Sequence, residues 1–175
     1  MNFFDFFGLP VRYAIDPDEL KAKYFETSRK YHPDLHGQAK AAVQAEMLEK
    51  SAFNNQAYKV LSDPDQRLKY LLDLFEILKE EGKNEVPHDF LMAMMDYNEA
   101  MMELEMEPDP EKLQQLNEKL KELENDLSSD VVQVLKIPDA SSLTEQEWSA
   151  LAEYYLKKRY LRRFRSNLSK LEEQP

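Results

Sequence analysis

The chain has 175 residues, of which 42% are hydrophobic and three are glycine, a composition that favours helices around one ordinary core or two small ones. The absence of cysteine excludes disulfides, thiolate metal sites and cysteine-based catalysis, and it agrees with a cytoplasmic protein. A net charge of −11 disfavours nucleic-acid binding, and apolar runs that all fall short of the ~20 residues of a membrane helix argue against a membrane protein.

Helix signals follow the short aromatic start of the chain. Asp16-Pro17-Asp18-Glu19 supplies an N-cap, a proline in the first turn and a glutamate that can close a capping box. The apolar face of this first long helix holds Leu20, Tyr24, Thr27 and Tyr31. The helix must end near that last tyrosine because Pro33 pushes His32 away from helical geometry. A second long helix is predicted from about Gln38 to Leu61, and Asp63-Pro64-Asp65 separates it from a shorter one.

Residues 76–87 are charged, contain Gly82 and Pro87 and lack an apolar face, so we interpret them as a linker between modules at 1–75 and 88–175. The second module contains three predicted helices: one from His88 to Met106, a leucine-rich one that ends before Pro138, and a last one that Thr144 and Glu147 cap with a capping box. Short connections predict an antiparallel three-helix bundle, and the prolines disfavour the alternative of an extended coiled coil. The predicted fold class is therefore all-α.

The negative charge is concentrated in the second half of the chain. Residues 1–75 carry 10 basic and 11 acidic side chains, whereas residues 76–175 carry 13 basic and 23 acidic ones. One basic stretch, Lys157–Arg165, could bind an anionic partner, but we expect it to lie against acidic helices of its own module or to face water. Neither a nucleic acid nor a membrane is therefore expected as a partner.

The segment His32-Pro33-Asp34 lies between the first two long helices. Pro33 fixes one backbone torsion and removes a donor, which stops the helix and stiffens the loop. Asp34 is an acceptor, and His32 can both donate and accept a hydrogen bond near neutral pH. A rigid loop with such groups suits docking better than catalysis. The second helix and its continuation carry the run Asn55–Pro64 and then Arg67 and Tyr70.

This order of residues, with the Phe6-Phe7-Gly8-Leu9 opening, resembles the J-domain family over roughly residues 1–75. The resemblance implies an antiparallel helical hairpin with flanking short helices, whose loop engages the ATPase domain of a DnaK-type chaperone and stimulates ATP hydrolysis. The chaperone-binding residues that it implies are His32, Pro33, Asp34, Lys23, Arg29 and Lys30. We expect the last three to lie away from the apolar face of the first helix. Phe25-Glu26 and Leu35 stand where general J-proteins often carry basic residues, which points to a dedicated chaperone.

The loop and the basic residues of the first helix also have alternative explanations. The His32-Pro33-Asp34 segment could be an ordinary helix-ending turn, and the basic side chains could form only a solvated face. His32 and His36 are four residues apart and could bind a metal together. However, Pro33 breaks the helix that would align them, and no third ligand is evident. No metal site and no cofactor are therefore predicted.

The predicted helix from His88 to Met106 has two apolar arcs. At 100° per residue, its core arc holds Phe90, Met94, Tyr97, Met101 and Leu104. A second arc holds Leu91, Met92, Met95, Asp96, Glu99 and Glu103. A helix in a three-helix bundle needs only one apolar face, so the second arc leaves large apolar side chains among carboxylates, which suits a partner site. The alternative is that Met92 and Met95 pack under the linker or against the first module.

The first module ends with Tyr70-Leu71-Leu72, and the acidic second module contains Phe90-Leu91-Met92. This combination is similar to the HscB family, whose members bring the iron–sulfur scaffold protein IscU to the specialised DnaK-type chaperone HscA. The resemblance implies that the scaffold binds at Leu91, Met92, Met95, Asp96, Glu99 and Glu103, with Tyr160 contributing from the last helix. A purely structural Tyr160 is the alternative. Some eukaryotic members carry a cysteine-rich zinc element, and its absence here favours the bacterial type.

The sequence thus predicts a cytoplasmic, monomeric adaptor without enzyme activity, whose partners are an HscA-like chaperone and an IscU-type scaffold. A Ser/His/Asp arrangement or a phosphate loop, which would indicate catalysis, is not evident. Three other functions stay open. They are a J-domain co-chaperone for a different client, a structural helical interaction protein, and a metal-dependent enzyme that uses His32 and His36.

Overall fold

The structure is a computed structural model that describes residues 1–36, 40–80 and 83–172. These residues form seven α-helices and two short 3-10 helices without any strand, which confirms the all-α fold class. Within the same ranges, no helix is both long enough and apolar enough to cross a membrane. The chain divides into two compact units, of which the first holds residues 1–75 and 135–143 and the second holds residues 76–134 and 144–175.

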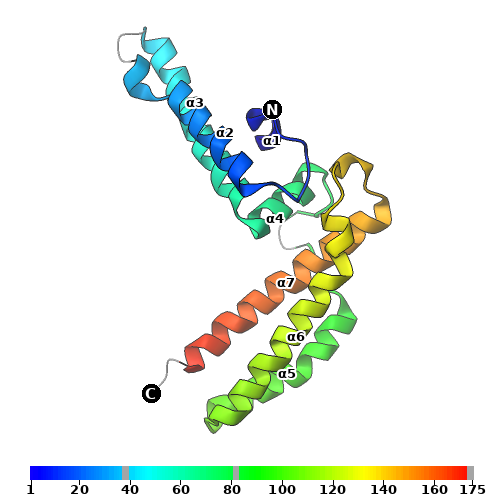
Figure 1. Ribbon diagram of the computed structural model, residues 1–175. Coiled ribbons are helices and arrows are strands. Elements are labelled where there is room, and N and C mark those ends of the chain that lie inside the picture. The colour runs from blue at the N-terminus through cyan, green and yellow to red at the C-terminus, as the bar shows by residue number, and fades with distance from the viewer. Residues whose placement is uncertain (37–39, 81–82, 173–175) are drawn as a thin grey trace. The chain divides into compact units, whose positions relative to one another are not determined.

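The first unit is built on a helical hairpin (Figure 1). Its main elements are α1 (Phe3–Phe7), α2 (Pro17–Lys30), the 3-10 helix η1 (Pro33–His36), α3 (Ala41–Ser62) and α4 (Pro64–Leu74). Helices α2 and α3 lie side by side and antiparallel, α1 packs against both, and α4 packs against α3. The predicted start of the second long helix at Gln38 lies outside the described residues. Its end at Ser62 is one residue beyond the predicted end.

Two Asp-Pro pairs begin helices in this unit. The carboxylate of Asp16 accepts the backbone N–H of Asp18 at 2.9 Å. The carboxylate of Asp63 accepts the backbone N–H groups of Asp65 and Gln66, both at 2.9 Å. The proline after each aspartate occupies the first turn, where its missing N–H would have had no partner within the helix. The helix starts predicted from the two Asp-Pro pairs are therefore confirmed.

Aromatic pairs brace the hairpin and the start of the chain. Tyr24 of α2 stacks on Tyr58 of α3, with ring centroids 4.3 Å apart. Phe3 of α1 stacks on Tyr70 of α4 at 4.4 Å, and its backbone N–H donates to the Tyr70 hydroxyl at 3.0 Å. Each such pair contributes about 0.5–1.5 kcal/mol beyond the burial of its area. These aromatic contacts therefore hold α2 and α3, the two helices of the hairpin, in a fixed arrangement.

Arg67 is a buried cation in the same core. Its guanidinium lies 5.0 Å from the centre of the Tyr13 ring, and its Nη1 donates to the carbonyl of Leu61 at 2.7 Å. Burial lowers the pKa of Arg67, because the charged form loses hydration. The residue ties the end of α3 to α4.

The segment Leu135–Leu143 groups with the first unit, although the sequence interpretation includes it in the second module. It contains the 3-10 helix η2 (Ala140–Ser142), and the buried Ala140 donates its N–H to the carbonyl of Val11 at 2.8 Å. A backbone bond between residues so far apart in the sequence leaves no periodic signal. The hydrophobic pattern therefore could not reveal this contact.

The second unit is a bundle of three helices. They are α5 (His88–Met106), α6 (Pro110–Leu135) and α7 (Glu145–Glu172), which lie side by side in Figure 1. The core holds Phe90, Met94 and Leu104 from α5, Leu116 and Leu120 from α6, and Leu161, Phe164 and Leu168 from α7. The capping box predicted for α7 is confirmed, since Glu147 donates its N–H to Thr144 Oγ1 at 3.3 Å and accepts the Thr144 N–H at 2.8 Å.

Candidate partner-binding surfaces

The loop after α2 presents an imidazole and a carboxylate to solvent. The side chains of His32 and Asp34 are 54% and 88% exposed, and His32 Nδ1 lies 3.7 Å from Asp34 Oδ2. The backbone N–H of Asp34 donates to the same Nδ1 at 3.3 Å. Both side chains are therefore within reach of a partner that approaches the tip of the hairpin.

The hydrogen bonding of His32 depends on its protonation. In the neutral imidazole, an Nδ1 that accepts the N–H of Asp34 leaves the proton on Nε2. In the imidazolium, Nδ1 carries a proton as well, and it faces the Asp34 carboxylate at 3.7 Å. In both states the ring offers an N–H donor at Nε2 beside an exposed carboxylate.

The side chains of Pro33 and His36 lie outside the described part of the chain. A role of the Pro33 ring in binding and the alternative of a metal pair formed by His32 and His36 therefore stay predictions. Among the side chains that the structure does describe, no three His, Cys, Asp or Glu residues are grouped so that they could hold a metal ion.

The basic residues of α2 do not all face the same way. Arg29 and Lys30 are exposed, and Arg29 Nε donates to the carbonyl of Phe25 at 3.4 Å. Lys23 is half-buried, which differs from the expected placement. At 100° per residue, Lys23 lies about 60° from the buried Leu20 and thus on the flank of the packed face. It therefore does not share the fully exposed side of α2 with Arg29.

Two large apolar side chains are exposed near these charged groups. Phe25 on α2 is 49% exposed, and Leu35, which follows Asp34 directly, is 70% exposed. They occupy the positions where the sequence departs from general J-proteins. A partner of this surface would meet apolar side chains as well as charges.

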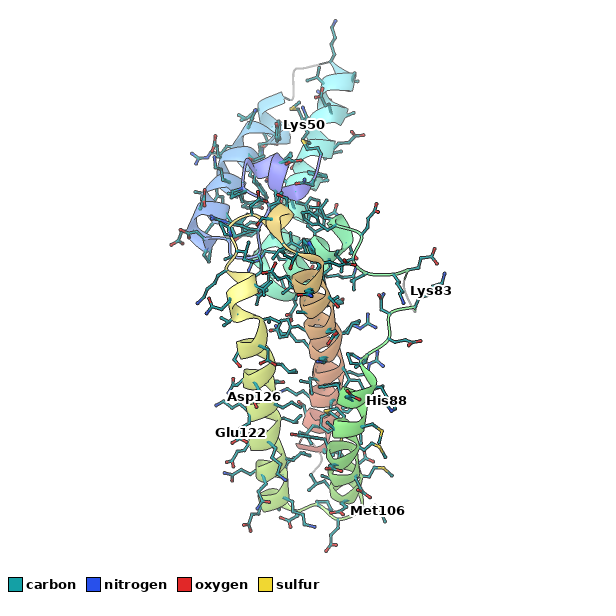
Figure 2. The ribbon with its side chains drawn as sticks, turned by 90° about the vertical axis from the view of Figure 1, so that its right-hand side faces the viewer. Lys50, Lys83, His88, Met106, Glu122 and Asp126 are labelled. Carbon is teal, nitrogen blue, oxygen red and sulfur yellow. The ribbon has the colours of Figure 1, made fainter. Side chains whose placement is uncertain are left out.

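The outer side of α5 presents a second surface. Leu91, Met92 and Met95 are 37%, 53% and 57% exposed. Figure 2 shows sulfur-bearing side chains that stand out from α5 between the labelled His88 and Met106. The exposure of these methionines favours a partner site over packing under the linker. We call Leu91, Met92, Met95, Asp96, Glu99 and Glu103 together the α5 surface.

Carboxylates border the apolar part of the α5 surface. Asp96, Glu99 and Glu103 are all exposed. Glu103 Oε2 lies 3.5 Å from Lys112 Nζ near the start of α6, and both side chains are more than half exposed. An exposed ion pair of this kind contributes only about 0–1 kcal/mol, so a basic partner could replace Lys112 at little cost. The sequence did not predict a role for Lys112, because its partner Glu103 lies on a different helix and the period of one helix gives no information about the other.

Tyr160 of α7 is half-buried against α5. Its ring packs edge-on against Phe90, with centroids 5.7 Å apart, and its hydroxyl accepts a hydrogen bond from Asn98 Nδ2 at 3.1 Å. The same Nδ2 donates to the carbonyl of Met94 at 2.8 Å. Tyr160 therefore has a structural role in the bundle. Asn98, which the sequence interpretation did not single out, holds it in place.

The basic stretch Lys157–Arg165 pairs with acidic residues of its own unit. Arg165 donates from Nε and Nη2 to the two carboxylate oxygens of Glu124 on α6, at 2.6 and 2.8 Å. Lys157 Nζ lies 3.5 Å from Glu153 Oε2. The pair of Arg165 and Glu124 agrees with the expectation that this stretch lies against acidic helices of its own module, whereas Lys157 and Glu153 both lie on α7.

Comparison with known proteins gives a match for each unit. A sequence model of the DnaJ domain matches residues 2–70, and one of the HSCB C-terminal oligomerisation domain matches residues 86–169. The fold is similar to that of the chaperone HscB from Vibrio cholerae, with 25% sequence identity, coverage of 99% of both chains and a TM-score of 0.72. It is also similar to the human co-chaperone protein HscB, with 21% identity, coverage of 99% of this chain and 83% of that chain, and a TM-score of 0.75.

Proposed function

Because the chain belongs to the HscB family of J-domain co-chaperones, we propose that it stimulates ATP hydrolysis by an HscA-like chaperone and delivers an IscU-type iron–sulfur scaffold to it. The family is not enzymatic, and ATP hydrolysis is the work of the chaperone. We place this function in the cytoplasm. We ascribe it to a monomer, because each unit encloses its own apolar residues. The observation that carries the proposal is that the two units expose surfaces of different chemistry.

The surface of the first unit suits a chaperone. His32 and Asp34 offer a donor and a carboxylate at the tip of a braced hairpin, so binding there orders few further groups. Arg29 and Lys30 add exposed positive charge that would steer an acidic surface of the chaperone toward the loop. We assign smaller roles to two further residues. Pro33 would stiffen the loop, and Lys23 would act from the flank of α2.

The α5 surface suits the scaffold. Leu91, Met92 and Met95 form an apolar centre, and the three carboxylates form its border. In such an interface, the apolar anchors supply most of the binding energy, and the charges steer a basic partner surface into place. We propose that the ring of Tyr160 supports this centre from α7.

ATP hydrolysis by an HscA-type chaperone, measured with and without an IscU-type scaffold, tests both halves of the proposal. His32→Gln should reduce the stimulation at least about tenfold in both conditions, because it replaces the rigid imidazole at the hairpin tip with a flexible amide. The variant Leu91→Ala/Met92→Ala/Met95→Ala (the patch variant) should keep the stimulation without scaffold and lose the additional effect of the scaffold. Far-UV circular dichroism of both variants should match that of the wild type, because all four side chains are exposed.

Two outcomes would favour other functions. Absence of stimulation by the wild type would favour a structural interaction protein, whereas stimulation that survives His32→Gln would exclude the proposed role of the His32 imidazole. A patch variant that responds to the scaffold as the wild type does would favour a co-chaperone with a different client.

A further inference from the structure

The exposed methionines of α5 continue beyond the apolar centre of the α5 surface, which Leu91, Met92 and Met95 form. Met102 and Met106 are 61% and 87% exposed, although neither was singled out from the sequence. At 100° per residue, Met102 lies about 20° to one side of Met95 and Met106 about 20° to the other. The three side chains therefore stand in one row along the outer side of α5.

This methionine row is long for an exposed apolar feature. Together with the exposed Leu91 and Met92, which continue it toward the start of α5, the row extends about 22 Å from Leu91 to Met106, at 1.5 Å per residue. In Figure 2 the labelled His88 and Met106 mark the two ends of α5, and sulfur atoms stand out from the helix between them. A contiguous exposed apolar area is typical of interaction sites, and methionine adapts well to irregular partner surfaces.

The charges beside the row indicate which kind of partner it fits. Asp96, Glu99 and Glu103 are exposed along its border, and Glu99 lies between Met95 and Met102 in the sequence. A second copy of this chain on the row would bring the same carboxylates face to face, which disfavours self-association. A partner with an apolar strip bordered by lysine or arginine would satisfy both the methionines and the carboxylates.

We propose that Met102 and Met106 form a second apolar contact region for the scaffold, so that the apolar contact runs along the whole of α5 rather than along its N-terminal half. This inference rests on the proposed function, because it assigns the two residues to the same client. The inference is supported by the positions of the two methionines. Both are exposed on the same side of α5 as Leu91, and both lie beside the same exposed carboxylates. A basic side chain of the client would compete with Lys112 for Glu103.

Isothermal titration calorimetry of the full chain with a purified IscU-type scaffold tests this extension. Met102→Gln/Met106→Gln makes the end of the row polar with little change in helix propensity, and it should raise Kd roughly tenfold. Met102→Leu/Met106→Leu keeps the row apolar and should bind within about twofold of the wild type. Leu48→Gln on α3 replaces an apolar residue that is 62% exposed, so it serves as the matched control and should leave Kd unchanged.

The outcomes separate this inference from the proposed function. If the glutamine pair binds as tightly as the wild type while the patch variant loses binding, the extension is wrong and the proposed function stands. If the wild type does not bind the scaffold at all, the proposed function itself fails. Equal losses in the glutamine and leucine pairs would also overturn the extension. So would a wild-type dimer in sedimentation that the glutamine pair abolishes, because the row would then serve a second copy.

Discussion

Asn98 joins two helices through a single nitrogen atom. Its Nδ2 donates to the carbonyl of Met94 within α5 at 2.8 Å and to the hydroxyl of Tyr160 on α7 at 3.1 Å. Both bonds lie at the edge of the apolar core, where water competes less than at an open surface. They hold the Tyr160 ring against Phe90, next to the exposed side chains of the α5 surface.

Tyr160→Phe separates a structural role of this residue from a binding role. The change removes the hydroxyl and keeps the ring, so we expect the free energy of unfolding to fall by about 1 kcal/mol, the usual contribution of one hydrogen bond. The Kd for the scaffold should stay within about twofold, because the packing of the ring is preserved. Urea denaturation and calorimetry measure the two quantities. A large loss of affinity at unchanged stability would instead show that the hydroxyl contacts the scaffold.

Individual residues were predictable where a single helix contains the whole signal. The exposure of Met92 and Met95 follows from the period of α5 alone, and the structure agrees with it. The roles of Asn98 and Lys112 depend on where a second helix lies, which the period of the first does not contain. Lys23 and Lys30 lie on the same flank of α2, about 60° and 80° from Leu20, yet only Lys30 is exposed, a difference that the period of one helix does not determine.

At the scale of elements, helix starts were the best-predicted features. Asp16, Asp63 and Thr144 each cap a helix through bonds to residues two or three positions later, so the sequence contains both partners of every bond. The segment Leu135–Leu143 is the opposite case. Its grouping with the first unit involves a bond from Ala140 to Val11, which no local pattern specifies.

The capping box of α7 predicts a dependence of stability on pH. Bonds from the backbone N–H and hydroxyl of Thr144 lower the pKa of Glu147. A carboxyl group with a lowered pKa in the folded state stabilises the fold above its unfolded pKa, and this stabilisation is lost as the pH falls through the folded pKa. Glu147→Gln should therefore lower Tm at neutral pH, and the difference from the wild type should shrink as the pH falls through the folded pKa of Glu147, which lies below the ordinary value of a glutamate.

Thermal denaturation at a series of pH values measures this difference. Glu145→Gln, which changes another carboxylate in the first turn of α7, controls for the general effect of negative charge at a helix start. Thr144→Ala removes the cap itself and should cost about 1 kcal/mol of stability. A difference between Glu147→Gln and the wild type that does not shrink as the pH falls below the ordinary glutamate range would contradict the assignment.

At the scale of the whole molecule, the two units differ in the charge they present. With Lys136 and Asp139 included, the first unit is close to neutral, with 11 basic and 12 acidic side chains, whereas the second carries 12 basic and 22 acidic ones. In the proposed function, the first unit would therefore meet less repulsion from an acidic chaperone surface, and the α5 surface would attract a basic client. Holding both surfaces on one chain is what distinguishes an adaptor from two independent binding proteins.

Adaptor action predicts that the two surfaces must belong to the same chain. His32→Gln retains the α5 surface and the patch variant retains the chaperone surface, so an equimolar mixture contains both surfaces on separate molecules. Attachment within one chain raises the effective concentration of scaffold beside the chaperone to roughly the millimolar range for a short flexible connection. At micromolar protein we therefore expect the mixture to show the stimulation of the patch variant without any scaffold-dependent increase in ATP hydrolysis.

Wild type mixed with an equal amount of His32→Gln is the control for this experiment, and it shows how far the defective chain competes for scaffold. If the mixture of the two variants responds to scaffold as fully as this control does, the surfaces act independently. Co-localisation on one chain would then contribute nothing to delivery. A mixture that stays at the level of the patch variant requires both surfaces on the same chain, because the mixture contains each intact surface but never the two together on one molecule.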